Sequence, residues 1–374
     1  MKIPLAKPWI DKNDINNVVK CLESGWLIQG AFNEELEQRF AELTNVKHAV
    51  SCNSCTTALT LSLESVGIKE GDEVIVTPYS FIASANCIDQ VGAKPVFVDI
   101  EKDTYNLDVN LIEKAITDKT KAVIAVHQYG LMVDMDPLME LAKKFNLKII
   151  EDAACAHSAE YKGKKAGSIG DVGCFSFHPR KIITCGEAGM ITTNNEEIFE
   201  YVQAMRNHGM VAKQSVWERH KSNSINLPEF KYRGHNFRLT DIQAAMAVSQ
   251  LNKLEEILQK RREIAEYYNS HLDKDFYQTP AEPEDRKHIW QTYNLLVKDK
   301  DSRDDIIKYL QEKGISSQSG ATLITKQPAY SEYKDLSFPN AEFVTERSLT
   351  IPLFPQMTKE EVEYVVEALN NYKK

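Results

Sequence analysis

The first two-thirds of the chain alternates short apolar runs with segments of helical periodicity. The runs are rich in β-branched residues and nearly continuously apolar, as strands buried on both faces of a parallel sheet are. They are Val74–Thr77, Lys94–Ile100, Ala122–His127 and Lys148–Glu151. Between them, Thr56–Val66 and Met135–Phe145 carry apolar residues at helical spacing. Repeated strand–helix–strand units predict right-handed crossovers and an α/β fold, with helices on both faces of a mainly parallel sheet.

The last third of the chain has a different pattern. Thr240–Leu272 predicts one long helix or two in series, and we place a domain change near Leu251. Beyond it the pattern predicts two strands and two helices, at Gln291–Val297, Leu349–Pro352, Asp304–Lys313 and Lys359–Asn371. A chain of 374 residues exceeds the size at which single cores stop growing. We therefore expect a large domain over residues 1–250 and a smaller α+β domain over residues 251–374.

Charge, hydrophobic content and cysteine number disfavour several classes of protein. Lys and Arg number 45 against 54 Asp and Glu, which gives a net charge of −9, and 43% of residues are hydrophobic. These values indicate a folded globular protein and disfavour nucleic-acid binding by bulk charge. No apolar stretch approaches the ~20 residues of a membrane span, and the first residues lack the apolar core of a secretory signal. Seven scattered cysteines predict reduced thiols and a cytoplasmic location.

Two ionisable residues stand where cofactor chemistry is expected. Asp152 follows the apolar run at 148–151, and the ligand crevice of an open α/β sheet lies at the carboxyl ends of its strands. The alternative is that Asp152 only caps the next helix. Lys181 lies between apolar flanks and a glycine-bearing turn, where desolvation would lower its pKa and make its amine a nucleophile. The alternative is a surface lysine in a loop.

A polar turn opens the helix predicted at 56–66. Its segment Ser51–Leu59 combines hydroxyl side chains with the free N–H groups of a helix start, which together form a phosphate cradle or a simple N-cap. The same turn holds a Cys-x-x-Cys pair, Cys52 and Cys55, which a thiol oxidoreductase or half of a metal site would also show. No second Cys pair completes a zinc site, so we expect no metal. A further polar segment, Tyr232–Asp241, precedes the long helix and is consistent with a loop and cap.

Together these features match the needs of pyridoxal 5′-phosphate (PLP). That cofactor requires an acid for its pyridine nitrogen, a lysine for its aldehyde and a cradle for its phosphate. Further motifs follow in order along the chain. They are Ser24–Gly30, Gly71–Val76, His127–Gly130, Ile150–Ala154, Phe175–Gly189, Arg206–Gly209, Asn236–Asp241 and Gln327–Tyr330. In these motifs, over nearly its whole length, the chain resembles the sugar aminotransferases of the DegT/StrS group, which are fold-type I PLP enzymes with a large three-layer domain and a smaller one.

The resemblance implies roles for individual residues. Lys181 matches the lysine that holds the cofactor as an imine and later moves the proton, and Asp152 matches the acid at the pyridine nitrogen. Phe81 matches the aromatic residue that stacks on the ring. His157 lies in the active-site segment after Asp152 and is a third catalytic candidate. The phosphate-binding positions are matched by Ser54, Cys55, Thr56 and Ser176.

Asn236 matches a residue that reaches the phosphate from the neighbouring subunit, which implies a homodimer with shared active sites. The chain also departs from the family pattern. Cys55 stands where glycine is usual, and Cys155 stands where glutamine is common, near the phenolic oxygen of the cofactor. Gly320-Ala321 and Thr325 occupy the places of a His-Tyr pair and a later His in the region that approaches the sugar.

The implied activity is transfer of an amino group from glutamate to a nucleotide-linked keto sugar. The reaction is ping-pong, with pyridoxamine 5′-phosphate as the second cofactor form. A 4-keto-6-deoxyhexose is the expected substrate and a 3-keto sugar the alternative. Some relatives dehydrate sugars with a His in place of the lysine, and Lys181 argues against that reaction. A non-catalytic PLP-binding regulator and a thiol oxidoreductase remain the other hypotheses.

Overall fold

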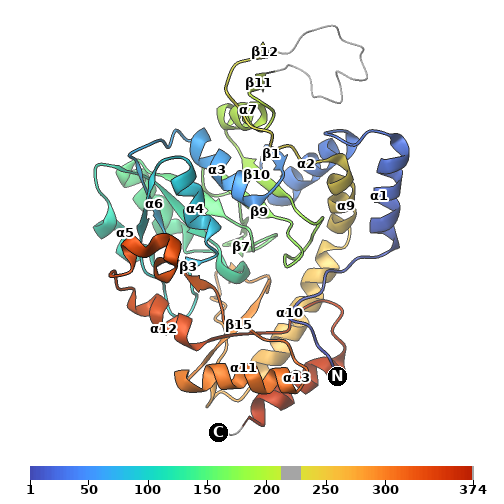
Figure 1. The fold of residues 1–374 in the computed structure, drawn as a ribbon, viewed down its shortest axis with the longest axis vertical. Coiled ribbons are helices and arrows are strands. Elements are labelled where there is room, and N and C mark those ends of the chain that lie inside the picture. The colour runs from blue at the N-terminus through green and yellow to red at the C-terminus, as the bar shows by residue number, and fades with distance from the viewer. Residues whose placement is uncertain (212–228, 373–374) are drawn as a thin grey trace.

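The computed structural model describes residues 1–211 and 229–372, and its centre is one seven-stranded sheet (Figure 1). The spatial order of the strands is β1-β10-β9-β6-β5-β2-β4. Their bounds are β1 His48–Cys52, β2 Glu73–Val76, β4 Lys94–Phe97, β5 Thr120–Val126, β6 Lys148–Asp152, β9 Val172–Ser176 and β10 Gly189–Thr193. The strands β4, β2, β5, β6 and β9 pair in parallel, whereas β10 is antiparallel to both of its neighbours. The predicted mainly parallel α/β sheet is confirmed.

Helices cover both faces of this sheet, which makes three layers. The alternation of side chains along β5 shows the division: Val123 and Ala125 enter one core, and Ala122, Ile124 and Val126 enter the other. The first core is closed by α2 Ala31–Thr44, α5 Val109–Ala115, α6 Met135–Phe145 and α9 Asp241–Leu251. The second is closed by α3 Cys55–Ser65, α4 Ala83–Gln90 and α7 Glu196–Met205.

A third core lies in the smaller part of the molecule. Its sheet is antiparallel and contains β13 Tyr277–Gln278, β15 Tyr293–Val297 and β17 Ser348–Ile351. Its helices are α10 Leu254–His271, α11 Arg303–Glu312 and α13 Lys359–Asn370. Ile3 also packs here, and it bridges to Ile315. The start of the chain thus lies against the small part, while we keep 1–250 and 251–374 as the proposed domain division.

Two further α-helices and seven short strands complete the set that the structure describes. The helices are α1 Lys12–Ser24 and α12 Pro339–Arg347, and the short strands are β3 Tyr79–Ser80, β7 Glu160–Tyr161, β8 Lys164–Lys165, β11 Met210–Val211, β12 Glu229–Phe230, β14 Arg286–Lys287 and β16 Thr322–Leu323. The helical pattern at 240–272 is two helices in series, separated at Asn252 and Lys253. Within the described ranges no helix is long and apolar enough to cross a bilayer.

The carboxyl end of β6 is fixed by a buried acid. Glu151 is fully buried, and its two oxygens accept hydrogen bonds from the backbone N–H groups of Gly167, Ile169 and Gly170 at 2.7–2.8 Å. His127, also fully buried, lies with Nε2 2.9 Å from Oε2 of Glu151. Burial raises the pKa of Glu151, but the hydrogen bonds from His127 and the amides outweigh that effect, so its pKa lies below the usual range.

We predict that Glu151→Gln lowers the free energy of unfolding by about 2–3 kcal/mol, because the new amide cannot accept all of the buried N–H bonds. Urea unfolding measures the change. Glu113→Gln is the matched control, since Glu113 is half-exposed and forms a surface pair with Lys144 at 2.6 Å. A surface pair of this kind contributes less than about 1 kcal/mol. Equal losses in the two variants would contradict the anchoring role of Glu151.

Candidate active site

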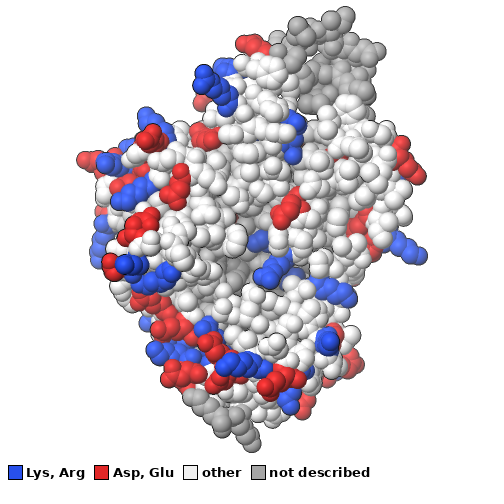
Figure 2. All heavy atoms as spheres, viewed as in Figure 1, with Lys and Arg blue, Asp and Glu red and all other residues white. Residues whose placement is uncertain are grey.

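A cavity of about 830 Å³ collects most of the residues singled out in the sequence. Its walls come from the carboxyl ends of β5 and β6, from the start of α3 and from the small part of the molecule. Figure 2 shows a hollow between the larger and smaller parts, with basic side chains beside it. Of the predicted site residues, those that line the cavity are Ser54, Cys55, Thr56, Phe81, Asp152, Cys155, Ser176 and Lys181.

Asp152 lies at the end of β6 and is 5% exposed. Its Oδ2 accepts a hydrogen bond from the Ser84 hydroxyl at 2.7 Å, and its Oδ1 accepts one from the Ala154 N–H at 3.2 Å. Turns follow Asp152, not a helix, so the helix-cap alternative is wrong. A carboxylate offers about four acceptor positions, and these two donors leave capacity for a further cationic partner.

Lys181 brings an amine to the same cavity. Its Nζ lies 3.1 Å from Sγ of Cys155. Burial lowers the pKa of Lys181, as the sequence predicted. The interaction with Cys155, which includes a hydrogen bond, and the smaller interactions with Cys55 and Asp152 outweigh burial and raise the pKa above its usual value. The expectation of a lowered pKa in the protein alone is therefore wrong, because the amine lies among acidic groups.

The start of α3 forms the cradle. The Ser54 hydroxyl caps the helix by accepting from the Thr57 N–H at 3.2 Å. The N–H groups of Cys55 and Thr56 find no acceptor in the described part of the chain, so they are free to bind an anion. Cys55 is an ordinary first helical residue with negative φ, which explains why glycine is not required there.

Glycine is required instead at Gly189, behind this turn. A Cβ at that position would lie 2.2 Å from the carbonyl oxygen of Ser54. The close approach of β10 to the start of α3 therefore depends on the missing side chain. This contact has no local signal in the sequence, because the two residues are 135 positions apart and the antiparallel pairing of β1 with β10 brings them together.

Two predicted residues lie outside the cavity. His157 is fully buried, and its ring packs against Phe40, Phe175 and Phe177. Burial, with a smaller effect of the Lys181 charge, lowers the pKa of His157 to about 3, so its ring is neutral at physiological pH. Its placement does not support the expected catalytic role, because its ring does not line the cavity. Asn236 is exposed and bridges to Asn207, near the cradle but not on the cavity wall of its own chain.

Three cavity residues have roles that the sequence did not indicate. Ser84 lies on α4, one helical turn after Phe81, and holds Asp152. Tyr129 follows the β5 strand and has a positive φ of 56°, which is unusual for a residue other than glycine. The Gln291 amide donates to the carbonyl of Arg180 at 2.7 Å and so ties the small part to the segment that carries Lys181. Of these three residues, Ser84 alone could have been found from the sequence, because it lies three positions after Phe81 in the same segment.

The Cys-x-x-Cys pair does not have the features of a redox centre. Burial raises the pKa of the Cys52 thiol to about 11 and raises the pKa of Cys55 well above its usual range. Both thiols are therefore protonated at neutral pH, whereas reactive cysteines are thiolates. All seven cysteines are free, and across residues 1–211 and 229–372 no cluster of His, Cys, Asp and Glu has the arrangement of a metal site.

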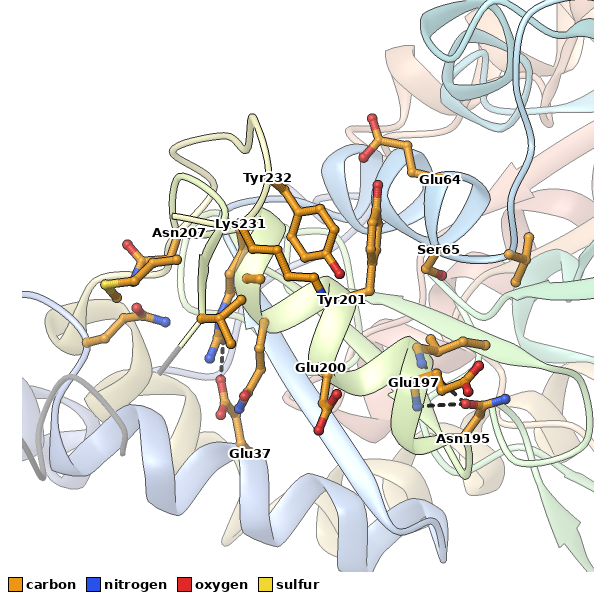
Figure 3. A pocket seen from close by; sticks show the side chains of 18 of the residues that line it. Glu37, Glu64, Ser65, Asn195, Glu197, Glu200, Tyr201, Asn207, Lys231 and Tyr232 are labelled. Carbon is orange, nitrogen blue, oxygen red and sulfur yellow. Dashed lines mark hydrogen bonds and ion pairs between the residues drawn. The ribbon is translucent and has the colours of Figure 1, made fainter. Parts of the chain in front are cut away.

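A second cavity, of about 890 Å³, lies beside α2, α7 and the β11–β12 hairpin (Figure 3). Its walls include Glu37, Tyr201, Lys231 and Tyr232, and the Arg206 guanidinium donates to the Glu37 carboxylate there. None of the residues predicted to bind the cofactor lines this cavity. The chemistry-bearing groups are therefore gathered in the cavity at β6.

Comparisons with known proteins identify the family of this chain. A family model described as the DegT/DnrJ/EryC1/StrS aminotransferase family matches residues 8–370. The GDP-perosamine synthase of Caulobacter vibrioides is 37% identical over 374 residues, which cover 99% of this chain and 98% of that protein. The dTDP-3-amino-3,6-dideoxy-alpha-D-galactopyranose transaminase of Aneurinibacillus thermoaerophilus is 39% identical over 355 residues, with coverage of 94% and 93%. The structure of Spr1654 from Streptococcus pneumoniae in its PLP form matches with a TM-score of 0.91 and 31% identity, over 99% of this chain and 98% of that one.

Proposed function

The chain belongs to the DegT/DnrJ/EryC1/StrS aminotransferase family, and on that premise we propose that it transfers an amino group from glutamate to a nucleotide-linked keto sugar. The fold is that of fold-type I PLP-dependent transferases. We propose that both half-reactions use one PLP in the cavity at β6. The observation that carries this proposal is the placement of Asp152, Lys181 and the start of α3 around a single cavity.

The residues of the cavity fit PLP. Asp152 has acceptor capacity left for a protonated pyridine nitrogen, and the free N–H groups of Cys55 and Thr56 suit a phosphate. The Ser176 hydroxyl lines the same cavity. Phe81, 74% exposed in the isolated chain, is available to cover one face of the ring. When bound, PLP supplies an electron-accepting ring that stabilises the charge left when a proton is removed from the donor amino acid.

The protein supplies position and proton transfer. Asp152 keeps the ring nitrogen protonated through the attraction of opposite charges, which is strong because water is largely excluded from the end of β6. Lys181 holds the cofactor at rest and, once the donor has displaced it, removes and returns the proton as a general base. Cys155, with Sγ 3.1 Å from Nζ of Lys181, would stand where the family commonly has a glutamine near the phenolic oxygen.

We propose a 4-keto-6-deoxyhexose as the acceptor and a 3-keto sugar as the alternative. Two relatives support a nucleotide sugar, since one is named for a GDP-linked and the other for a dTDP-linked product. The family match and the position of Lys181 on the cavity wall favour an enzyme over a non-catalytic regulator. We also propose a cytoplasmic location, which the seven free cysteines support.

We predict that protein loaded with PLP moves ¹⁵N from labelled glutamate to C4 of a nucleotide-linked 4-keto-6-deoxyhexose, with ping-pong kinetics. Mass spectrometry and NMR of the product give the amount and the position of the label, and the GDP-, dTDP- and UDP-linked sugars are compared. Lys181→Ala abolishes transfer, because the base is lost, but retains cofactor through the cradle. Lys148→Ala is the matched control, since Lys148 is exposed and pairs with Asp171 at 3.0 Å.

Each contrary result has a defined meaning. Label at C3 alone would replace the leading substrate with the 3-keto alternative. Bound PLP with no transfer from any amino donor to any of the sugars would favour the regulator hypothesis. Full activity of Lys181→Ala would remove Lys181 from the reaction.

We further propose a homodimer in which each active site is shared. Asn236 is exposed and does not line the cavity of its own chain. Its neighbour Phe237 accepts a hydrogen bond at its carbonyl from the Asn53 N–H at 2.9 Å, which places Asn236 near the start of α3. Its amide then donates to the cofactor phosphate bound by the partner subunit. Hydrogen bonds to charged groups contribute roughly 1.5–3 kcal/mol.

We predict that mixing two inactive variants, Lys181→Ala and Asn236→Ala, partly restores activity under conditions that exchange subunits. Each mixed dimer then has one doubly damaged site and one intact site. Asn236→Ala alone weakens cofactor retention with little change in unfolding. A fully active monomer, or no recovery despite proven subunit exchange and a demonstrably inactive Asn236→Ala parent, would refute the shared site.

A further inference from the structure

Two buried tyrosine hydroxyls meet at the wall of the cavity, beside the cofactor residues. The hydroxyl oxygens of Tyr79 and Tyr129 lie 2.9 Å apart. The Ala321 N–H, from the small part of the molecule, donates to both of them, at 3.1 Å to Tyr79 and 2.7 Å to Tyr129. Tyr79 is also 2.8 Å from the Ser348 hydroxyl. Tyr129 keeps 9% of its surface exposed and lines the cavity, whereas Tyr79 is fully buried.

Counting protons fixes the direction of each bond. Ser348 donates its single hydroxyl proton to the Val344 carbonyl at 2.7 Å, so it accepts from Tyr79. Tyr79 has thereby used its own proton, and the contact between the tyrosines is a donation from Tyr129 to Tyr79. Burial raises the pKa of Tyr79 and of Tyr129, so both hydroxyls keep their protons at neutral pH. The bonds therefore run from Tyr129 to Tyr79, Ser348 and Val344.

The same count of protons shows that the Tyr129 hydroxyl oxygen can accept one more hydrogen bond. A hydroxyl oxygen accepts up to two hydrogen bonds. Tyr79 accepts from Tyr129 and from Ala321, so its oxygen is saturated. Tyr129 accepts only from Ala321 among the described residues, and it is the tyrosine that borders the cavity. The Tyr129 oxygen is therefore satisfied within the protein, and its second acceptor position is available to a ligand that brings a hydroxyl.

Backbone geometry holds the Tyr129 hydroxyl in this place. Tyr129 has φ of 56°, and its carbonyl accepts from the Gln291 N–H at 3.1 Å. On the opposite side, a Cβ at Gly320 would lie 2.3 Å from the Tyr79 hydroxyl, so only glycine fits there. Residues 320–322 are in turn fixed to the large part by the pairing of Thr322 with Ser80. The site is thus built from both parts of the molecule.

We propose that Tyr129 is a substrate-binding residue whose hydroxyl oxygen accepts a hydrogen bond from a ring hydroxyl of the keto sugar. This inference rests on the proposed function. Glutamate carries no hydroxyl group, and its one hydrogen-bond donor, the amino group, is the group that reacts with the cofactor, so we assign the contact to the second half-reaction. In a 4-keto-6-deoxyhexose joined to its nucleotide at C1, the hydroxyls available to Tyr129 are those at C2 and C3. Tyr79 acts as a positioning residue, because it fixes the proton of Tyr129 away from the cavity.

The test compares Tyr129→Phe with wild type in the two half-reactions of the PLP-loaded enzyme. Absorbance follows the donor half-reaction with glutamate alone, and single turnover follows the sugar half-reaction. We expect the donor half-reaction to be unchanged and the KM for the keto sugar to rise about tenfold, which is the range of one neutral hydrogen bond. Tyr79→Phe, which leaves the Tyr129 proton without its acceptor, gives a smaller rise in the same half-reaction.

Tyr105→Phe is the matched control. Tyr105 belongs to the same aromatic cluster and is buried, but its hydroxyl donates to the Asn294 carbonyl at 3.2 Å and it does not line the cavity. Its loss leaves both half-reactions unchanged. The 2-deoxy and 3-deoxy sugars then identify the contact, since wild type and Tyr129→Phe have equal KM for the analogue that lacks the bound hydroxyl.

Two results would overturn the inference while the proposed function stands. One is that Tyr129→Phe impairs the donor and sugar half-reactions equally, or impairs neither. The other is that the ratio of the KM of Tyr129→Phe to the KM of wild type is the same for the parent sugar and for both deoxy analogues. If wild type aminates no nucleotide-linked keto sugar, the proposed function fails and the inference fails with it.

Discussion

Two consecutive buried carboxylates at the end of β6 determine how the rest of the site is arranged. Side chains alternate along a strand, so Glu151 and Asp152 face opposite sides of the sheet. Glu151 is satisfied by His127 and three backbone N–H groups, which fix the loops at the carboxyl edge. Among the described residues, Asp152 accepts hydrogen bonds only from the Ser84 hydroxyl and the Ala154 N–H. Glu151 therefore fixes the loops at the carboxyl edge of the sheet, and Asp152 keeps acceptor capacity for a cationic ligand.

The cavity depends on both parts of the molecule. The sheet supplies Asp152, the start of α3 supplies anion-binding N–H groups, and the segment after β9 supplies Lys181. The small part closes the space through residues 320–322 and through the Gln291 bond to the Arg180 carbonyl. Closure by a second part limits water at the reacting groups, which strengthens the electrostatic interactions on which proton transfer depends. This arrangement suits an aminotransferase that accepts a small donor and a larger sugar at one site.

The sequence predicted the parallel strands β2, β4, β5 and β6, helix α6 and the cavity residues around Lys181 and Asp152, because apolar periodicity and local motifs are short-range signals. It did not predict the parallel strand β9. It did not predict the antiparallel insertion of β10, whose place depends on pairing between β1 and β9. It placed His157 in the site, whereas three phenylalanine rings enclose that ring. The expected pKa of Lys181 was wrong in sign, since the charges around an amine depend on distant segments. The contact of Tyr129 with Ala321 was invisible for the same reason.

The most direct test of the central claim is the rate at which Asp152→Asn exchanges the Cα hydrogen of glutamate with solvent. The measurement uses glutamate deuterated at Cα and PLP-loaded protein, with bound cofactor quantified beforehand and urea unfolding as the check on the fold. We expect normal unfolding and an exchange rate lower than wild type by orders of magnitude, because the neutral amide no longer keeps the ring nitrogen protonated. A variant with bound cofactor and near-wild-type exchange would contradict this expectation.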